Sequence, residues 1–110
     1  MPEERPPSEF EIEQQSEQEL IRRLKEKGPE DPETRDTLIT WTREQEERVR
    51  ESNDPEAAIQ FNLKRGRLYS SAGYPEEALK NFESARMQAW NESMDALHKA
   101  IMTEMDQLEL

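Results

Sequence analysis

Few side chains in this sequence have a type and spacing suited to catalysis. His98 is the single histidine, and the 110 residues include no cysteine that could act with it as a nucleophile or metal ligand. Glu76 and Glu77 are neighbours, but successive residues of a helix diverge by about 100° and so do not face the same atom. The three glycines form no phosphate-binding loop. We therefore expect no enzymatic activity, and no bound cofactor or metal.

The net charge of the chain indicates which classes of molecule it can bind. The sequence has 26 acidic and 15 basic residues, which give a net charge of −11. Nucleic acids and anionic membrane surfaces attract basic proteins, so we expect neither as a partner. The chain also lacks an apolar run near the roughly 20 residues of a membrane span, and its first residues do not form a signal peptide. Together with the absence of cysteine, this pattern favours a cytoplasmic protein.

One strip of polar residues could instead bind a partner. At about 100° per residue, four side chains of the helix expected at 55–72 fall within about 60° of each other, opposite its apolar arc. They are Gln60, Lys64, Arg67 and Ser71. Two cations side by side in an acidic protein favour an acidic ligand, through charge-assisted hydrogen bonds. The alternative is that Lys64 and Arg67 only keep one helix face hydrated.

The chain contains a segment that has the character of such a ligand. The stretch from Glu9 to Glu19 is rich in glutamate and includes Phe10 and Ile12. We expect it to be able to occupy the strip, in the same chain or in a neighbouring one. Residues 1–15 are otherwise predicted to be an acidic, proline-containing tail, because they have little apolar surface to bury.

The elements that position these residues are predicted to be helices. Asp31 and Asp54 are suitable N-caps, and a proline follows each at the first helical position. Gly73 can take the left-handed conformation that ends a helix. The expected fold is all-α, with a single domain at 16–110 that forms a small antiparallel array. Its four main helices are expected near residues 16–27, 32–51, 55–72 and 75–109.

Two boundaries allow alternatives. Ser16 and Glu19 form a capping box at the start of the first helix, although the pattern also permits a start at Ser8. At the other end, the apolar stripe of the amphipathic segment 91–109 lies about 120° from the stripe that precedes it. The last helix therefore either breaks near residues 91–93 or faces two different surfaces. The second stripe consists of Met94, Leu97, Ile101, Met105 and Leu108.

The middle of the chain, 55–90, is expected to form a closely packed helical hairpin. Gly66 lies within the apolar arc of the first helix, where glycine costs about 1 kcal/mol relative to alanine. We expect a close approach of the second helix to offset this cost, with Phe82 filling the space. Tyr69, Ala78 and Ala85 are predicted to belong to the same contact.

These five residues and their spacing resemble the core positions of a tetratricopeptide repeat, and the turn GYPEEA at 73–78 is similar to the turn of that family. The resemblance covers about one repeat, residues 59–92. It departs from the family pattern at Asn62 and Arg65, where large apolar residues are usual. The proline that ends the repeat is also absent.

The resemblance implies a module that binds a protein partner, either a peptide or a helix, with the strip around Lys64 lining its concave groove. Because about three repeats are normally needed to bury the apolar faces, we also expect a homo-dimer that uses the stripe around Ile101 as its oligomer surface. Two alternatives remain. One is a structural helical protein whose main role is homo-oligomerisation, and the other is a three-helix binding domain similar to the microtubule-interacting and trafficking class.

Overall fold

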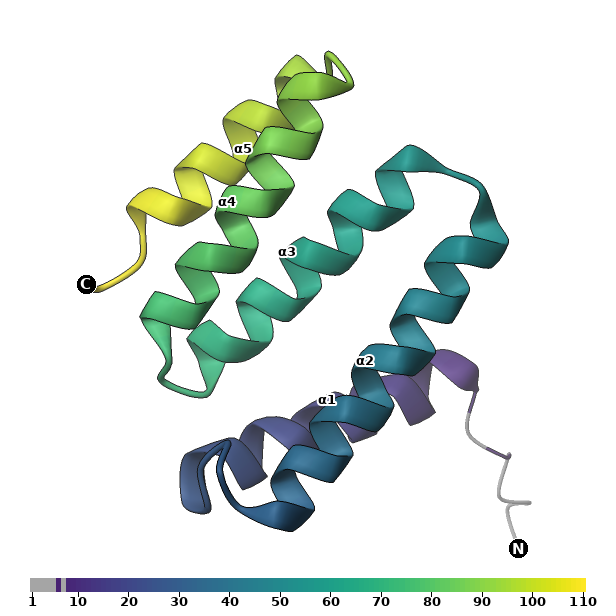
Figure 1. Cartoon of the computed structure of the whole chain (residues 1–110), viewed down its shortest axis with the longest axis vertical. Helices are drawn as coiled ribbons and strands as arrows, with labels where there is room; N and C mark the ends of the chain where they lie inside the picture. Colours follow the sequence, from purple (N-terminus) through teal and green to yellow (C-terminus); the bar gives the residue numbers. More distant parts are fainter. Residues whose placement is uncertain (1–5, 7) are drawn as a thin grey trace, which may run out of the picture.

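The structure, a computed structural model, describes Pro6 and residues 8–110 (Figure 1). The regular elements in this part of the chain are all α-helices. They are α1 (Glu9–Glu26), α2 (Pro32–Ser52), α3 (Pro55–Ser71), α4 (Pro75–Asn91) and α5 (Asp95–Asp106). The prediction of an all-α protein is confirmed. The described residues form five helices rather than four, because the expected last helix is divided into α4 and α5.

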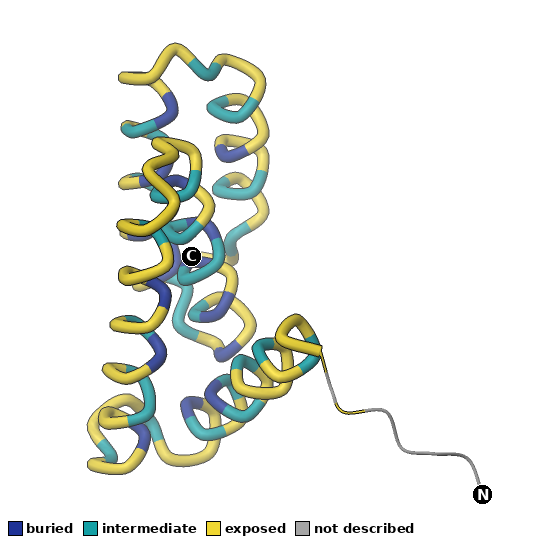
Figure 2. Tube along the Cα trace, turned by 90° about the vertical axis from the view of Figure 1, so that its right-hand side faces the viewer, coloured by how far each residue is buried: buried dark blue, intermediate teal, exposed yellow. Residues whose placement is uncertain are grey.

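Helix α3 is central to the arrangement, since it contacts α1, α2 and α4. Helices α3, α4 and α5 lie side by side with alternating direction, whereas α2 diverges from α3 after their shared turn (Figure 1). Helix α1 contacts both α2 and α3 and projects from the layer formed by the other helices (Figure 2). Across the described residues, none of the helices has the length and apolar character needed to cross a membrane.

Helix α1 begins at Glu9 rather than near Ser16. The Ser8 side chain caps it, because its Oγ accepts a hydrogen bond from the Glu11 amide at 3.2 Å. Acidic residues in the first turn lie at the positive end of the helix dipole, which stabilises this start. Most of the expected tail at 8–15 is therefore helical, and residues 1–5 and Pro7 of that tail lie outside the described residues.

The starts of α2 and α3 agree with the predicted caps. The Asp31 carboxylate accepts hydrogen bonds from the amide and the hydroxyl of Thr34, at 3.1 and 3.0 Å. These bonds lower the pKa of Asp31. The Asp54 carboxylate accepts a bond from the Glu56 amide at 3.0 Å. A proline occupies the first turn of each helix, where its missing N–H leaves no internal bond unmade.

Each of the four turns contains a residue in the left-handed conformation. These residues are Gly28, Asn53, Gly73 and Ser93, with φ angles of 85°, 52°, 89° and 57°. At the last turn, the Met94 amide donates a hydrogen bond to the Ala89 carbonyl at 2.9 Å and closes the end of α4. This turn reverses the chain and lays α5 back along α4 (Figure 1).

The core consists of two buried clusters that meet at α3. The cluster between α3, α4 and α5 contains Ile59, Leu63, Ala78, Phe82, Ala85, Ala89 and Ile101. The cluster between α1, α2 and α3 contains Leu20, Leu24, Trp41, Leu68 and Ala72. Since α3 contributes to both, it joins the first two helices to the last two.

The predicted contact between Gly66 and Phe82 is confirmed. A Cβ atom added to Gly66 would lie 2.7 Å from Phe82 Cε1, which is closer than atoms can pack. Ala78 and Ala85 are fully buried in the same cluster, and Tyr69 packs against it. The absence of a side chain at residue 66 therefore allows the aromatic ring to lie directly on the α3 backbone.

Candidate functional site

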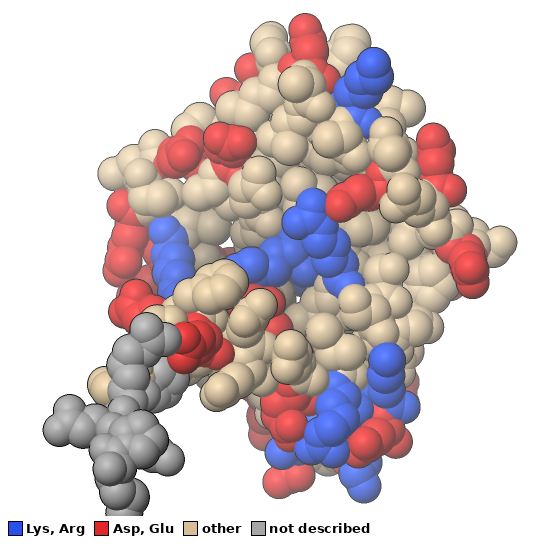
Figure 3. All heavy atoms as spheres, turned by 180° about the vertical axis from the view of Figure 1, so that it is seen from behind, with Lys and Arg blue, Asp and Glu red and all other residues tan. Residues whose placement is uncertain are grey.

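The four residues of the predicted strip lie together on one face of α3. Gln60, Lys64, Arg67 and Ser71 line a hollow of about 350 Å³, together with Leu68 of α3 and with Glu17 and Ile21 of α1. Figure 3 shows the face on which α1 lies, where basic side chains gather near the middle and acidic ones surround them. This hollow is the candidate site.

Lys64 binds the N-terminal half of α1. Its Nζ lies 2.6 Å from Glu13 Oε1 and 3.4 Å from Glu17 Oε1. Two α2 residues complete the surroundings of Glu13: Gln45 Nε2 donates to its Oε1 at 2.9 Å, and Arg48 Nη1 donates to its Oε2 at 2.8 Å. Within the same chain, the acidic segment 9–19 therefore contacts the strip at Lys64, through Glu13 and Glu17.

The surroundings of Glu13 stabilise its charged form. Partial burial alone would raise the pKa of this carboxyl group. The hydrogen bonds from Lys64 and Gln45, together with the positive charges of Lys64 and Arg48, outweigh burial and lower the pKa from 4.5 to about 2. The carboxylate of Glu13 is thus a specific ligand of the strip rather than a group in free solvent.

The contact of Glu17 is less complete. Its Oε1 is buried and has no hydrogen-bond partner among the described residues, although Lys64 lies within ion-pair distance. A buried carboxylate oxygen without a hydrogen bond is costly. The second position along the strip is therefore bound more weakly than the first.

Arg67, the other cation of the strip, pairs with the last helix, α5. Its Nη2 and Nε lie 2.8 and 2.9 Å from Glu104 Oε1 of α5. The strip thus pairs with acids from α1 on one side and from α5 on the other. Phe10 and Ile12 of the acidic segment, in contrast, are exposed.

The side chains that α2 contributes to this site were not predicted from the sequence. Gln45 is buried, and it lies one turn after buried Trp41 on the same face of α2. A polar residue that continues an apolar stripe is a signal that it has a partner, because a buried amide needs hydrogen bonds. The residues around Gln45 in the second half of α2 are nearly all polar, a pattern that is more typical of a solvated helix surface.

The two departures from the repeat pattern are joined in one polar network across the hairpin. Asn62 Nδ2 donates to Gln88 Oε1 at 2.8 Å, and Arg65 donates to Asn62 and to Asn81. The Arg65 guanidinium also lies 4.8 Å from the centre of the Phe61 ring. Asn62 and Arg65 can lie at these positions because each has a hydrogen-bond partner on the facing helix or on the same one.

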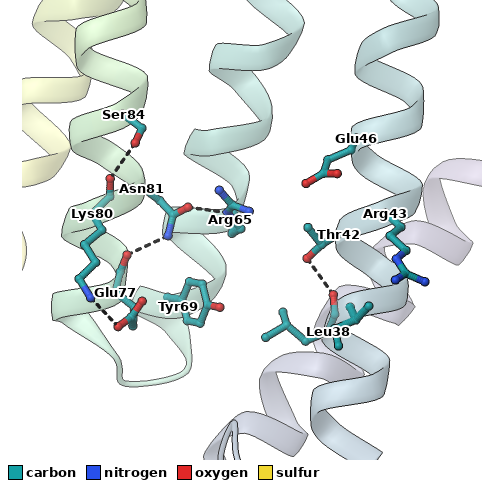
Figure 4. A pocket seen from close by; sticks show the side chains of 11 residues that line it. Leu38, Thr42, Arg43, Glu46, Arg65, Tyr69, Glu77, Lys80, Asn81 and Ser84 are labelled. Atoms are coloured by element: carbon teal, nitrogen blue, oxygen red, sulfur yellow. Dashed lines mark hydrogen bonds and ion pairs between the residues drawn. The ribbon is translucent and has the colours of Figure 1, made fainter.

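A second, larger groove of about 590 Å³ separates α2 from the hairpin (Figure 4). Leu38, Thr42 and Glu46 of α2 lie on one side of it, and Tyr69 and Asn81 lie on the other. Burial raises the pKa of the Tyr69 hydroxyl. Acidic and basic groups alternate around this groove, so it has no single charge preference.

The stripe expected to form the oligomer surface is packed inside the chain. Ile101 is buried in the cluster between α3, α4 and α5, and the other four residues, Met94, Leu97, Met105 and Leu108, pack against that cluster and are partly buried. The physical reason is the turn at Ser93, which directs the stripe toward the hairpin instead of toward solvent. This stripe is therefore an internal packing face.

The candidate catalytic residues His98, Glu76 and Glu77 have the following surroundings in the structure. His98 packs against the ring of Trp90, with 5.2 Å between the ring centroids. Glu77 forms an ion pair with Lys80 at 3.1 Å, and Glu76 is exposed. In the part of the chain that the structure describes, no three histidine, aspartate or glutamate side chains are grouped to hold a metal ion.

No protein-family model, curated protein or solved structure significantly matches the chain. The likeness of residues 59–92 to a tetratricopeptide repeat therefore stays a prediction from the sequence. The packing around Gly66 and the ion pairs of Lys64 are properties of this chain in their own right.

Proposed function

We propose that this chain is a non-enzymatic protein-interaction module, built on a tetratricopeptide-like hairpin, whose basic strip on α3 binds an acidic segment of a partner protein. One observation carries the proposal. Lys64 lies within ion-pair distance of two α1 carboxylates, those of Glu13 and Glu17. A strip that pairs with acids from inside the chain has the geometry to pair with acids from outside it.

Helix α1 is a template for the chemistry of the partner. Its carboxylates at Glu13 and Glu17 are one helical turn apart, and Leu20 and Leu24 follow on the same side, both fully buried. Steps of three and four residues keep side chains on one face of a helix. The partner that fits best is therefore an acidic amphipathic helix, which competes with α1 for the strip.

The competition can be measured with the full chain and a fluorescein-labelled peptide of residues 8–27. In the Glu13→Gln/Glu17→Gln variant, α1 no longer neutralises Lys64, so the peptide should bind more tightly than it binds the unmodified chain. Removal of residues 1–15 should have the same effect. Fluorescence anisotropy reports the affinity. A matched variant, Glu46→Gln/Glu47→Gln, removes equal charge from α2 and should bind the peptide as the unmodified chain does.

The strip itself is tested by charge reversal. Lys64→Glu/Arg67→Glu should abolish binding, because both cations of the strip become anions that repel an acidic peptide. Arg35→Glu/Arg50→Glu makes the same change in net charge on exposed residues of α2 and should weaken binding only slightly. Equal affinities for these two variants would show that the peptide responds to overall charge and not to the strip.

A further inference from the structure

An exposed apolar patch lies on the outer face of α4 and α5, away from the basic strip. The exposed fractions of Trp90, Met87 and Met102 are 67%, 56% and 46%. The Trp90 ring also contacts the His98 ring, which joins the two helices at this end. Tryptophan is usually well buried, and apolar patches on a surface mark places where proteins dock.

The patch combines a hollow with an exposed methionine side chain one helical turn from it. Met87, Trp90 and His98 line a hollow of about 230 Å³, together with Arg86 and Asn91. Met102 follows His98 by one helical turn and is exposed beside it. A methionine side chain is flexible and packs favourably against aromatic rings, so it suits a hollow walled by tryptophan and histidine.

We propose that this patch binds the same patch of a second copy of the chain. Met102 of each copy enters the hollow beside Trp90 of the other copy. The same contact therefore occurs twice in the dimer. An exposed side chain and a hollow that can receive it, both on one face, allow a two-fold symmetric interface. This dimer does not use the stripe around Ile101, because Ile101 is buried and the rest of the stripe packs, partly buried, against the core of each chain.

Local charge permits the contact despite the net charge of −11. Arg86, the charged residue that lines the hollow, is already paired with Glu83 at 3.1 Å. The remaining charges are screened, since the Debye length is only about 8 Å at physiological ionic strength. The second copy therefore meets an apolar hollow beside a neutralised ion pair.

The position of the patch in the fold also favours a helix as its occupant. Helices α3, α4 and α5 lie side by side, with α4 packed on α3 and α5 packed on α4 (Figure 1). No described element covers the outer side of α4 and α5 around Trp90. Trp90, Met87 and Met102 therefore stay exposed within the single chain. In the dimer, α5 of the second copy covers this side.

Sedimentation velocity of the full chain from low to high micromolar concentration tests the proposal. The unmodified chain should form dimers as concentration rises, whereas Trp90→Glu and Met102→Glu should remain monomeric. Ile39→Glu is the matched control, because Ile39 is 41% exposed on α2 and the substitution adds the same charge. It should dimerise like the unmodified chain. Circular dichroism verifies that each variant keeps its helices.

A second measurement identifies the face in contact. Trp41 is only 5% exposed, so collisional quenching by acrylamide reports mainly on Trp90. Quenching should decrease as the unmodified chain dimerises and should remain unchanged with concentration in Met102→Glu, which retains the tryptophan. A chain that stays monomeric at high micromolar concentration overturns the proposal, even if a foreign helix protects Trp90. A dimer that survives Trp90→Glu, or one in which Trp90 stays fully quenchable, overturns it as well.

Discussion

At the scale of single residues, the Gly66–Phe82 contact determines how closely α3 and α4 approach. The ring is almost fully buried and lies against the α3 backbone. Phe82→Ala should therefore lower the free energy of unfolding by about 3–5 kcal/mol, as for other buried aromatic residues. Urea denaturation measures the change. A variant as stable as the unmodified chain would mean that the hairpin does not depend on this ring.

The substitution Gly66→Ala has two opposing effects on stability. Alanine is the better helix former by about 1 kcal/mol, but its Cβ would lie 2.7 Å from the Phe82 ring. Overpacking typically costs about 1–3 kcal/mol, so we expect a net loss of stability. In a Phe82→Leu background, the smaller side chain leaves room and the same substitution should become neutral or stabilising. Additive effects in the double variant would contradict direct contact between the two residues.

The Glu13 carboxyl group predicts a pH dependence. Its pKa in the folded chain is about 2, below its ordinary value of 4.5. A lowered pKa contributes stability above the ordinary value, and this contribution is lost as pH falls toward the folded value. The stability difference between the unmodified chain and Glu13→Gln should therefore be largest above about pH 4.5 and shrink toward pH 2. Chemical denaturation over this range measures it. A stability difference that does not change with pH would show that Lys64 does not hold the Glu13 carboxylate.

At the scale of elements, α1 is attached by two different kinds of contact. Its C-terminal half buries Leu20 and Leu24, and Tyr74 donates a hydrogen bond to the Leu24 carbonyl at 2.9 Å. Its N-terminal half is attached mainly by the ion pairs of Glu13 and Glu17. The two halves should therefore respond differently to substitution.

Hydrogen–deuterium exchange separates these halves. Glu13→Gln/Glu17→Gln should accelerate exchange in residues 9–17 and leave residues 20–26 protected, because the apolar contacts stay in place. Leu24→Ala should accelerate exchange across the whole helix and cost about 2–5 kcal/mol. Uniform protection of α1 in the double glutamine variant would show that the ion pairs do not hold its first half.

At the scale of the whole molecule, the net charge of −11 affects the two proposed contacts in opposite ways. Binding of an acidic peptide to the strip is an attraction between unlike charges, so its affinity should fall as salt rises. Dimerisation through the Trp90 patch joins two acidic chains by apolar contact. Its affinity should therefore increase or stay constant as the salt concentration rises. Anisotropy and sedimentation in low and high salt measure the two contacts separately. Weaker dimerisation in high salt would indicate an interface held by charges.

Much of the fold could be predicted from the sequence because its signals are local. Asp31 and Asp54 begin their helices through bonds to amides within three residues, and Gly73 ends a helix through its own φ angle. The Gly66–Phe82 contact was also predictable, since a tight turn leaves two antiparallel helices few ways to pair. The four residues of the strip share a face through helical periodicity alone.

The partners of the strip were decided by the tertiary structure. Glu13 and Lys64 are 51 positions apart, and Arg67 and Glu104 are 37 apart. Acidic residues are so abundant that no spacing distinguishes these two from the others. The left-handed conformation at Ser93 likewise determines that the stripe around Ile101 faces inward and that Trp90 stays exposed. Local patterns specify each helix and its faces, but the turn angles set the direction of the next helix and therefore which faces meet.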